Sequence, residues 1–297
     1  MHVMIFGAGY SGKAIGRLLS SAGHRVSGTT RSSEKQSALR ECGIAPLLFD
    51  GSEISPTLKA ELATVTHLVQ SIAPGRDGDP LIRLFGENEL KALMPKLEWI
   101  AYLSTVGVYG DHGGAWVDED TVLNPVSQRS IERVEAEMAW QALSERTGVP
   151  LAILRLSGIY GPGRNAFVNL SNGTARRLVK KDQVFNRIRV EDIAGAAAFL
   201  GERLQPGIYN VTDDDPCPPQ DVVAEAARLM GIAPPPEQPF ETAELTPMAR
   251  SFYGENKRVS NRRLKALGFA FSHPDYRHSL QDLWSNGTWN KAGDRAF

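Results

Sequence analysis

Short apolar segments alternate with segments of helical length through the first two thirds of the chain. The intervening stretches include residues 11–21, 81–93 and 130–146, each long enough for a helix. Near-continuous apolar strands separated by helices are typical of a parallel sheet with helices on both faces. The pattern therefore predicts a doubly wound α/β fold. The six apolar segments are residues 2–7, 24–30, 44–50, 66–73, 98–105 and 151–158.

A glycine-rich turn, GAGYSG at residues 7–12, follows the first apolar segment and opens the first helix. The first glycine allows a tight turn, the second lets backbone approach a pyrophosphate, and the third lets helix and strand pack closely. The helix N-terminus then presents its N–H groups to the phosphates. A nucleoside-triphosphate loop is disfavoured, because residue 14 is Ala where magnesium needs a Ser or Thr hydroxyl. The expected dinucleotide contacts are Gly7, Gly9, Tyr10, Ser11 and Gly12.

The end of the second apolar segment indicates which dinucleotide is bound. An NAD site places an acidic residue there to hold the ribose hydroxyls, but the sequence reads GTTRSS at residues 28–33. Arg31 can pair with a 2′-phosphate, and Thr30 and Ser32 can donate hydrogen bonds to it. The sequence therefore favours NADP over NAD, with an exposed polar turn as the alternative.

Composition narrows the classes of partner. The chain has 33 Lys and Arg against 34 Asp and Glu, so its net charge of -1 gives no global field to attract nucleic acid or an anionic membrane. No stretch approaches the ~20 apolar residues of a membrane span, and the first apolar segment is too short for a signal-peptide core. Two cysteines and unpatterned histidines predict no metal site. We therefore expect a cytoplasmic protein with a small-molecule partner.

The pattern changes after residue 161. Residues 162–186 are basic and irregular, whereas a helix over 191–204 and a strand over 207–212 look like a return to the sheet. Proline clusters then flank a helix near residues 220–230, which indicates a small lobe with rigid connections. We expect a dinucleotide-binding Rossmann domain over 1–161 with a return segment at 187–212, and a small C-terminal substrate lobe over 162–186 and 213–297.

Several segments resemble, in order, those of the extended short-chain dehydrogenase/reductases, the NAD-dependent epimerase/dehydratase family. They include STVGVYGD at 104–111, ILRLSGIYGPGR at 153–164 and NRIRVEDIAGA at 186–196. The segment at 257–269 resembles the C-terminal part of the atypical epimerase-like subgroup. The resemblance covers nearly the whole chain. It is specific for the superfamily rather than for a substrate, and by analogy with the family's helix-mediated dimers it allows a homodimer.

The resemblance assigns Thr105 to the family's catalytic Ser/Thr, whose hydroxyl binds the substrate oxygen at the reacting carbon. Arg129 and Arg133 stand where the family has the Tyr and Lys of Tyr-x-x-x-Lys. Because arginine stays protonated, Arg129 cannot exchange a proton as a phenol does, but it can bind an anion or stabilise an oxyanion. Arg133, one helical turn further, would face the same way. The pair predicts an anion clamp, with two solvated arginines as the alternative.

A substitute proton donor could come from the turn after Thr105. Tyr109 lies four residues beyond it, where the chain leaves the carboxyl end of a strand, and ligands bind at that edge of open α/β sheets. The resemblance instead gives Tyr109 a structural role in the family's VYG turn. His112 is a weaker candidate, so the proton donor stays unassigned.

Further contacts follow from the resemblance. Asp50 would contact the adenine amine, or as a turn residue would cap the following helix. Ser71 and Ala73 lie in a segment that resembles the one passing along the nicotinamide half. A last group would line the cleft between the lobes and contact an acidic substrate, with a plain surface role as the alternative. This group is Arg164, Asn186 and Arg187.

Together these features predict an NADP-dependent oxidoreductase or epimerase/dehydratase-like enzyme that acts on a small polar or sugar-like substrate. The alternative is a non-catalytic NADP-binding sensor or regulatory protein. The missing tyrosine favours the sensor, whereas the retained Thr105 and the two-lobe plan favour the enzyme.

Overall fold

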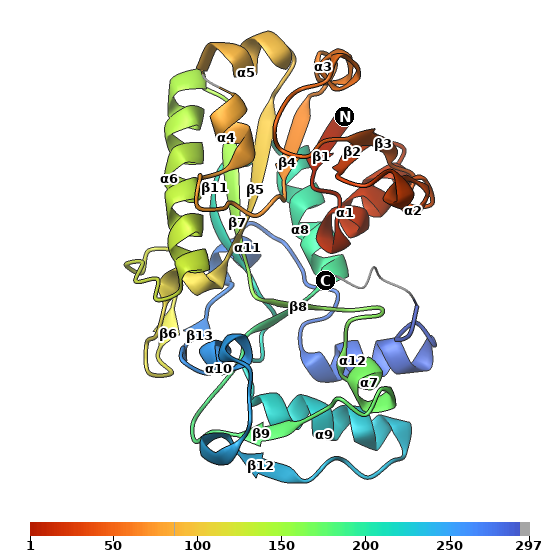
Figure 1. Cartoon of the computed structure of the whole chain (residues 1–297), viewed down its shortest axis with the longest axis vertical. Helices are drawn as coiled ribbons and strands as arrows, with labels where there is room; N and C mark the ends of the chain where they lie inside the picture. Colours follow the sequence, from red (N-terminus) through yellow and green to blue (C-terminus); the bar gives the residue numbers. More distant parts are fainter. Residues whose placement is uncertain (86, 292–297) are drawn as a thin grey trace. The chain divides into compact units, whose positions relative to one another are not determined.

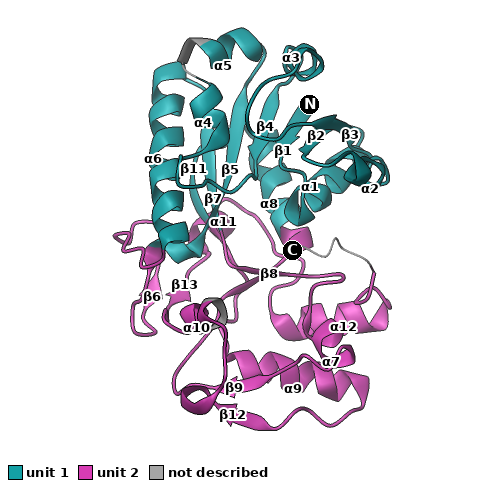
Figure 2. Ribbon diagram, viewed as in Figure 1, with its two compact units in different colours: residues 1–108, 128–155, 193–209 teal, residues 109–127, 156–192, 210–297 magenta. Residues whose placement is uncertain are grey.

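The computed structural model describes residues 1–85 and 87–291, which form two compact units (Figures 1 and 2). The expected division counted residues 109–127 with the first domain, but they belong to unit 2. The reason is that β6 (Trp116–Val117) in this segment pairs in parallel with β13 (Arg258–Val259). Unit 1 comprises residues 1–108, 128–155 and 193–209, and unit 2 comprises residues 109–127, 156–192 and 210–297.

Unit 1 is built on a seven-stranded sheet in the order β11-β7-β5-β4-β1-β2-β3. The pairs from β5 through β3 are parallel. The six predicted strands and the predicted return strand are confirmed. They are β1 (His2–Phe6), β2 (Arg25–Thr30), β3 (Ala45–Leu48), β4 (His67–Gln70), β5 (Trp99–Thr105), β7 (Leu151–Leu156) and β11 (Gly207–Val211).

Helices cover both faces of this sheet (Figure 1). Alternate residues of β1 show why, because Met4 and Phe6 join one core cluster while Ile5 faces α1 on the opposite side. The cluster also contains Leu58 of α3 and Trp140 of α6. The helices are α1 (Tyr10–Ser21), α2 (Gln36–Arg40), α3 (Pro56–Leu62), α4 (Pro80–Leu84), α5 (Glu87–Leu93), α6 (Gln128–Thr147) and α8 (Val190–Glu202).

The single helix predicted over residues 81–93 is wrong, because the chain forms α4 and α5 there. Phe85 ends α4 with the non-helical angles φ -107° and ψ 85°. Its ring is buried 6.2 Å from that of Phe6. The chain leaves the helical conformation at Phe85, and this ring packs in the core.

The order of strands reverses at β1. The chain runs outward from β1 to β2 and β3, and then crosses over to β4, β5 and β7 on the other side. In open α/β sheets, dinucleotides bind at such a reversal, outside the carboxyl ends of the strands. A dinucleotide site in this fold would therefore be formed by the residues that follow β1, β2, β4 and β5.

Unit 2 consists of short parallel strand pairs and short helices. The prediction that residues 162–186 are irregular is wrong, since they contain α7, capped by the Asn165 side chain, and β9. The predicted helix near 220–230 is confirmed as α9, which ends at Gly231 in the left-handed region (φ 69°). The strands besides β6 and β13 are β8 (Gly158–Tyr160), β9 (Arg177–Val179), β10 (Arg187–Arg189) and β12 (Glu237–Pro239); the helices are α7 (Ala166–Ser171), α9 (Pro219–Met230), α10 (Pro247–Phe252), α11 (Arg262–Ala266) and α12 (Tyr276–Ser285).

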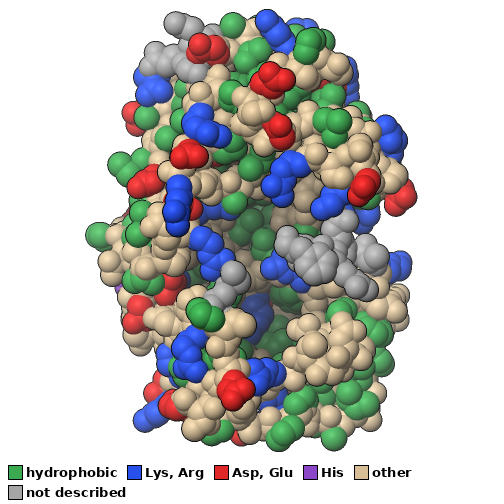
Figure 3. Space-filling view, in the orientation of Figure 1, with side chains coloured by type: hydrophobic (Ala, Val, Ile, Leu, Met, Phe, Trp, Pro, Cys, Tyr) green, Lys and Arg blue, Asp and Glu red, His purple; other side chains and the backbone are tan. Residues whose placement is uncertain are grey.

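Charges of both signs are interspersed on the face in Figure 3, in keeping with the balanced composition. Among the described residues, no helix has the length and apolar character that a bilayer crossing requires. Cys42 and Cys217 are both buried free thiols.

Candidate functional site

The glycine turn closes tightly against the segment after β4. Gly7 has φ +78°, and a Cβ there would lie 2.8 Å from Ile72 Cγ1 and 3.1 Å from the Ile72 backbone nitrogen. The Gly7 N–H donates to Thr29 Oγ1 at 2.9 Å, and the Ala8 N–H donates to the Thr29 carbonyl at 2.9 Å. The turn is thus fixed between the ends of β2 and β4, in a backbone conformation that favours glycine.

The remaining two glycines of the motif have different surroundings. A Cβ on Gly9 would meet only the Gly7 carbonyl oxygen, at 3.9 Å, so its backbone faces open space. A Cβ on Gly12 would lie 3.1 Å from Ile5 Cγ2, so glycine lets α1 lie directly on β1. The helix begins at Tyr10 with no acidic residue in its first turn. The positive end of the helix dipole therefore meets no acidic side chain of the first turn.

Two further glycines, which the motif did not flag, bring α1 against the sheet. A Cβ on Gly16 would lie 2.4 Å from Ile44 Cδ1, and one on Gly28 would lie 2.7 Å from Ile44 Cγ2. Gly16 follows Gly12 by four residues, so it lies on the same helix face. That spacing is the sequence signal that could have found it.

The predicted 2′-phosphate residues lie together where β2 ends. Thr30 and Ser32 are half-buried, and the Ser32 N–H donates to Thr30 Oγ1 at 3.3 Å. Arg31 between them is exposed. The Oγ1 of the neighbouring Thr29 accepts the Gly7 N–H, so the end of β2 is joined directly to the glycine turn.

Asp50 closes a turn and does not cap the next helix. Its Oδ1 accepts hydrogen bonds from the backbone N–H of Ser52 at 2.9 Å and from its hydroxyl at 2.6 Å. These bonds hold the pKa of Asp50 below its usual value. Helix α3 is capped by Ser55, which accepts from the Leu58 N–H. The cap alternative for Asp50 is therefore wrong.

Thr105 ends β5 and opens the next turn by accepting the Gly107 N–H at 3.1 Å. A Cβ on Gly107 would lie 2.8 Å from Ser130 Oγ and 3.4 Å from Thr105 Oγ1, so the Ser130 hydroxyl of α6 lies beside this turn. Sequence reasoning missed Ser130, which adjoins Arg129. The Tyr-x-x-x-Lys comparison drew attention to the two arginines instead.

A buried ion pair anchors the end of β5. Ser104 donates to Glu137 Oε1 at 2.5 Å, and Arg155 of β7 pairs with Glu137 Oε2 at 2.8 Å. Both charged side chains are 3% exposed. Because removing one partner of such a pair leaves a buried charge, the pair fixes α6 relative to β5 and β7.

The two arginines of α6 have different surroundings. Arg129 is exposed in the first turn. Arg133 is half-buried: its Nη1 donates to the Leu103 carbonyl, and its guanidinium lies 5.8 Å from the centre of the Tyr102 ring. Burial raises the pKa of Tyr102. Arg133 is therefore tied to β5, so the alternative of two solvated arginines does not describe it.

Tyr109 is fully buried in unit 2, and its hydroxyl donates to Asn210 Oδ1 at 2.7 Å. The ring nitrogen of His112 lies 3.1 Å from the Tyr109 carbonyl oxygen. This geometry favours the structural alternative for the tyrosine.

The predicted substrate contacts also have internal partners. Asn186 donates to the Lys257 carbonyl at 2.9 Å and accepts the Val259 N–H at 2.8 Å, so both ends of its amide are used. Arg187 donates to the Phe185 carbonyl and to Cys217 Sγ, each at 3.0 Å. Arg164 is exposed.

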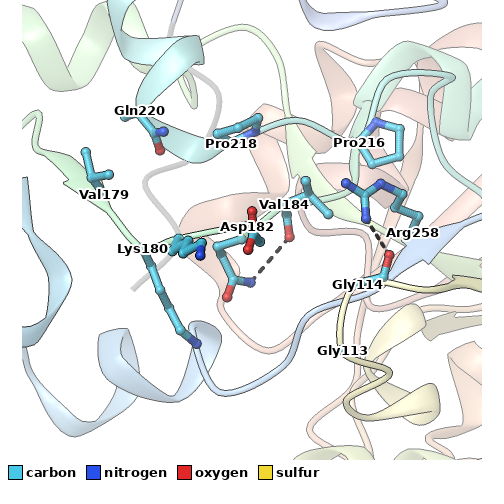
Figure 4. Close-up of a pocket in the computed structure, with 12 residues that line it drawn as sticks. Gly113, Gly114, Val179, Lys180, Asp182, Val184, Pro216, Pro218, Gln220 and Arg258 are labelled. Atoms are coloured by element: carbon cyan, nitrogen blue, oxygen red, sulfur yellow. Dashed lines mark hydrogen bonds between the residues drawn. The ribbon is translucent and has the colours of Figure 1, made fainter.

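Unit 2 contains a cavity of about 680 Å³ (Figure 4). Its lining carries three cationic side chains, Lys180, Lys181 and Arg258, against one carboxylate, Asp182. Arg258 donates to the Gly114 carbonyl, and Lys180 donates to the Tyr253 carbonyl. Pro216, Pro218, Val179 and Val184 add apolar wall. A concave site with this mixture suits a small polar molecule with negative charge.

Within the part of the chain that the structure describes, no group of three or more His, Cys, Asp or Glu side chains could hold a metal ion.

Comparison with known proteins agrees with this geometry. The profile of the NAD dependent epimerase/dehydratase family matches residues 3–212. The chain therefore belongs to that family, as the sequence resemblance implied. Its fold is the Rossmann-like α/β fold that these proteins share.

Several relatives align over nearly the whole chain. Protein YeeZ of Escherichia coli (strain K12) is 29% identical over 289 residues, covering 92% of this chain and 96% of YeeZ. The 3-diazoavenalumate denitrifying reductase of a Streptomyces species is 25% identical over 309 residues, covering 94% and 99%. A solved structure of a functionally unknown conserved protein from Silicibacter pomeroyi DSS is 47% identical, with a TM-score of 0.88 and coverage of 96% and 98%.

Proposed function

We propose that the chain is an NADP-dependent oxidoreductase or epimerase/dehydratase-like enzyme of this family. The observation that carries the proposal is the glycine turn at the β1/β4 reversal. The turn fits a dinucleotide, because Gly9 faces open space where a pyrophosphate needs backbone approach, and α1 begins there without an acidic residue. Gly7, Gly9, Tyr10, Ser11 and Gly12 would hold the pyrophosphate.

The preference for NADP rests on the end of β2. Thr30, Arg31 and Ser32 offer a guanidinium and two hydroxyls to a 2′-phosphate, with no carboxylate to repel it. Asp50 would lie near the adenine with its Oδ1 already engaged by Ser52. Ser71 and Ala73 would line the nicotinamide half, because they follow β4 on the other side of the reversal.

When bound, the nicotinamide supplies the hydride carrier. Thr105 would orient the substrate oxygen with its hydroxyl. Arg129, exposed at the start of α6, would stabilise negative charge on the substrate. Arg133 would act through its positive charge from beside β5. None of these groups releases a proton near neutral pH, so the proton donor stays unassigned.

The substrate would be small, polar and anionic or sugar-like. Lys180, Lys181 and Arg258 around the cavity of unit 2 support the anionic character. Arg164, Asn186 and Arg187 would add polar contacts, although Asn186 and Arg187 also hold hydrogen bonds within unit 2. The oxidoreductase class is supported by the Streptomyces relative, whose name is that of a reductase.

A non-catalytic NADP-binding sensor is the second candidate. It is favoured by the positions of Arg129 and Tyr109, since the first cannot relay a proton and the hydroxyl of the second is committed to Asn210. Oxidation of NADPH with a panel of aldehydes, ketones and nucleotide sugars distinguishes the two. Turnover that Thr105→Ala abolishes supports the enzyme, whereas tight cofactor binding without turnover supports the sensor.

Two further properties belong to the proposal. Two buried free thiols suit a reducing, cytoplasmic location. Met138, 63% exposed on α6, suits a helix-mediated homodimer, which light scattering would test.

Calorimetric titration with NADPH, NADP⁺, NADH and NAD⁺ is the first test. Micromolar binding of the phosphorylated pair alone supports the proposal. Absence of binding by all four would overturn it.

A further inference from the structure

The loop between β4 and α4 is held by a buried carboxylate. Asp79 is 2% exposed, and the Gln70 Nε2 donates to its two oxygens at 3.0 and 2.9 Å. The Trp140 indole N–H donates to Oδ2 at 3.1 Å. The Leu81 and Ile82 N–H groups donate to Oδ1 at 2.8 and 3.2 Å, which caps α4.

All of these donors are neutral. Within the described part of the chain no ion pair involves Asp79, so its charge is stabilised by hydrogen bonds alone. A buried carboxylate without a cation is expensive to desolvate, and its bonds must therefore be well formed. Helix capping does not require this arrangement, because Ser55 caps α3 with a hydroxyl. Beyond the cap, the same carboxylate accepts hydrogen bonds from the side chains of Gln70 and Trp140.

The Asp79 carboxylate sets the orientation of the Gln70 amide. A carboxylate only accepts hydrogen bonds, so Asp79 forces the amide of Gln70 to turn its NH₂ inward. The Gln70 Oε1 then points back along the chain and accepts the Ile72 N–H at 3.2 Å. If the amide were reversed, its NH₂ would face that N–H and the bond would be lost.

Ile72 is the residue against which the glycine turn packs. A Cβ on Gly7 would lie 2.8 Å from its Cγ1, and the preceding Ser71 N–H donates to the Phe6 carbonyl at 2.9 Å. The Asp79–Gln70 contact therefore sets how the loop after β4 lies against the turn after β1. These two backbones border the reversal of strand order, where a dinucleotide extends from the β1–β3 half of the sheet to the β4–β5 half.

We propose that Gln70, Asp79 and Trp140 form a positioning cluster that presets the loop after β4 for the nicotinamide half of the cofactor. The inference rests on the proposed function, and it deepens it by adding buried residues that act through Ile72 without touching cofactor. Trp140 links the cluster to α6, the helix that also carries Ser130 and Arg133.

The test compares the dissociation constants of NADPH and of adenosine 2′,5′-bisphosphate, which lacks the nicotinamide half. In Asp79→Asn the remaining oxygen keeps the α4 cap, and the new NH₂ faces both the Gln70 NH₂ and the Trp140 indole N–H. Turning the Gln70 amide relieves the contact between the two NH₂ groups and releases Ile72. We expect NADPH binding to weaken about tenfold, the value of roughly one hydrogen bond, with little change for the bisphosphate.

Gln70→Glu provides an independent variant. It places a second carboxylate against that of Asp79, and it should weaken NADPH binding in the same way. The double variant Gln70→Glu/Asp79→Asn restores a donor facing a carboxylate, while the carboxylate introduced at position 70 keeps an oxygen for the Ile72 N–H. It should therefore recover part of the NADPH affinity that each single variant loses, while the Trp140 N–H still lacks its acceptor. Ser55→Ala is the matched control, since it removes the cap of another unit 1 helix and should lower stability without separating the two ligands.

The outcomes separate the two proposals. If wild-type protein binds neither ligand, the proposed function fails and this inference falls with it. If wild type binds both, the cluster is overturned either by variants that bind NADPH normally or by variants that lose both ligands equally. A loss confined to NADPH, with recovery in the double variant, supports it.

Discussion

The glycine turn of unit 1 joins residues that are close neighbours in the sequence, whereas the cavity of unit 2 joins loops that are far apart in it. Gly7 and Gly12 are five positions apart, while the Arg258 guanidinium meets the Gly114 carbonyl across 144 positions. The turn depends on backbone geometry, so we expect a single added Cβ at Gly7 to disrupt it. The cavity works through side-chain charge, so single substitutions there should have graded effects. The first four predictions below test this contrast, from the largest expected effect to the smallest.

Gly7→Ala should have the largest effect. Its Cβ would overlap Ile72 in a left-handed conformation, so the turn must open. We expect NADPH affinity to fall by roughly 100-fold or more, measured by calorimetry. Gly23→Ala is the control, since Gly23 has φ +84° but nothing within 4 Å of the added carbon. Equal losses in both variants would contradict the role of close packing.

Thr30→Asp should reverse the preference between cofactors. A carboxylate at the end of β2 repels a 2′-phosphate and accepts bonds from the ribose hydroxyls. The ratio of NADPH to NADH affinities should shift by about 100-fold, or roughly 2.7 kcal/mol. An unchanged ratio of NADPH to NADH affinities would contradict the assignment of the end of β2 to the cofactor site.

Tyr109→Phe tests the buried hydroxyl. Removing it leaves Asn210 Oδ1 without its donor, so unfolding free energy should fall by about 1–3 kcal/mol in chemical denaturation. Cofactor binding and any turnover should persist. A stable variant without turnover would instead make Tyr109 the missing proton donor.

Lys181→Ala should show the graded effect expected of the cavity. Removing one exposed charge should weaken binding of inorganic pyrophosphate to unit 2 by about threefold, measured by titration at low salt. NADPH affinity should be unchanged. The control is Arg262→Ala, an exposed cation on α11 that does not line the cavity. Equal losses of pyrophosphate affinity in the two variants would mean that the effect comes from surface charge in general and not from the cavity.

A last prediction concerns pH. Burial raises the pKa of Asp213 well above its ordinary value, even though Arg187 opposes the rise. A raised pKa in the folded state means that the folded chain binds the proton more tightly, so this group lowers stability as pH rises above the ordinary carboxyl pKa. Asp213→Asn should therefore melt at a higher temperature than wild type near neutral pH. The difference should shrink near pH 4, and a constant difference would contradict the assignment.

The strands, the glycine turn and the family could be predicted from sequence because each depends on local pattern. Apolar segments such as residues 2–7 and 66–73 mark buried strands, and the motif glycines mark one turn. The break between α4 and α5 could not, since it depends on Phe85 packing against Phe6. Nor could the partners of Arg133, because the Leu103 carbonyl reaches it only after α6 packs on β5.

The side-chain networks were the least predictable part of the site. In the sequence, Asp79 before Pro80 is typical of an ordinary helix cap. No local pattern predicts that the side chains of Gln70 and Trp140 also donate hydrogen bonds to it. The family resemblance implied that Asn186 would contact the substrate. It holds the backbone of residues 257 and 259 instead, which no spacing rule connects to position 186.

The pairing of β6 with β13 has a consequence for the order in which the protein is made. Residues 109–127 leave the ribosome well before their strand partner at Arg258–Val259 is synthesised. The hydrogen-bond partners of the Asn186 side chain, residues 257 and 259, lie in the same later segment. The sheet of unit 1 has all its strands once residue 211 has emerged. During synthesis the sheet of unit 1 can therefore assemble first, while β6 stays an unpaired edge until β13 has emerged.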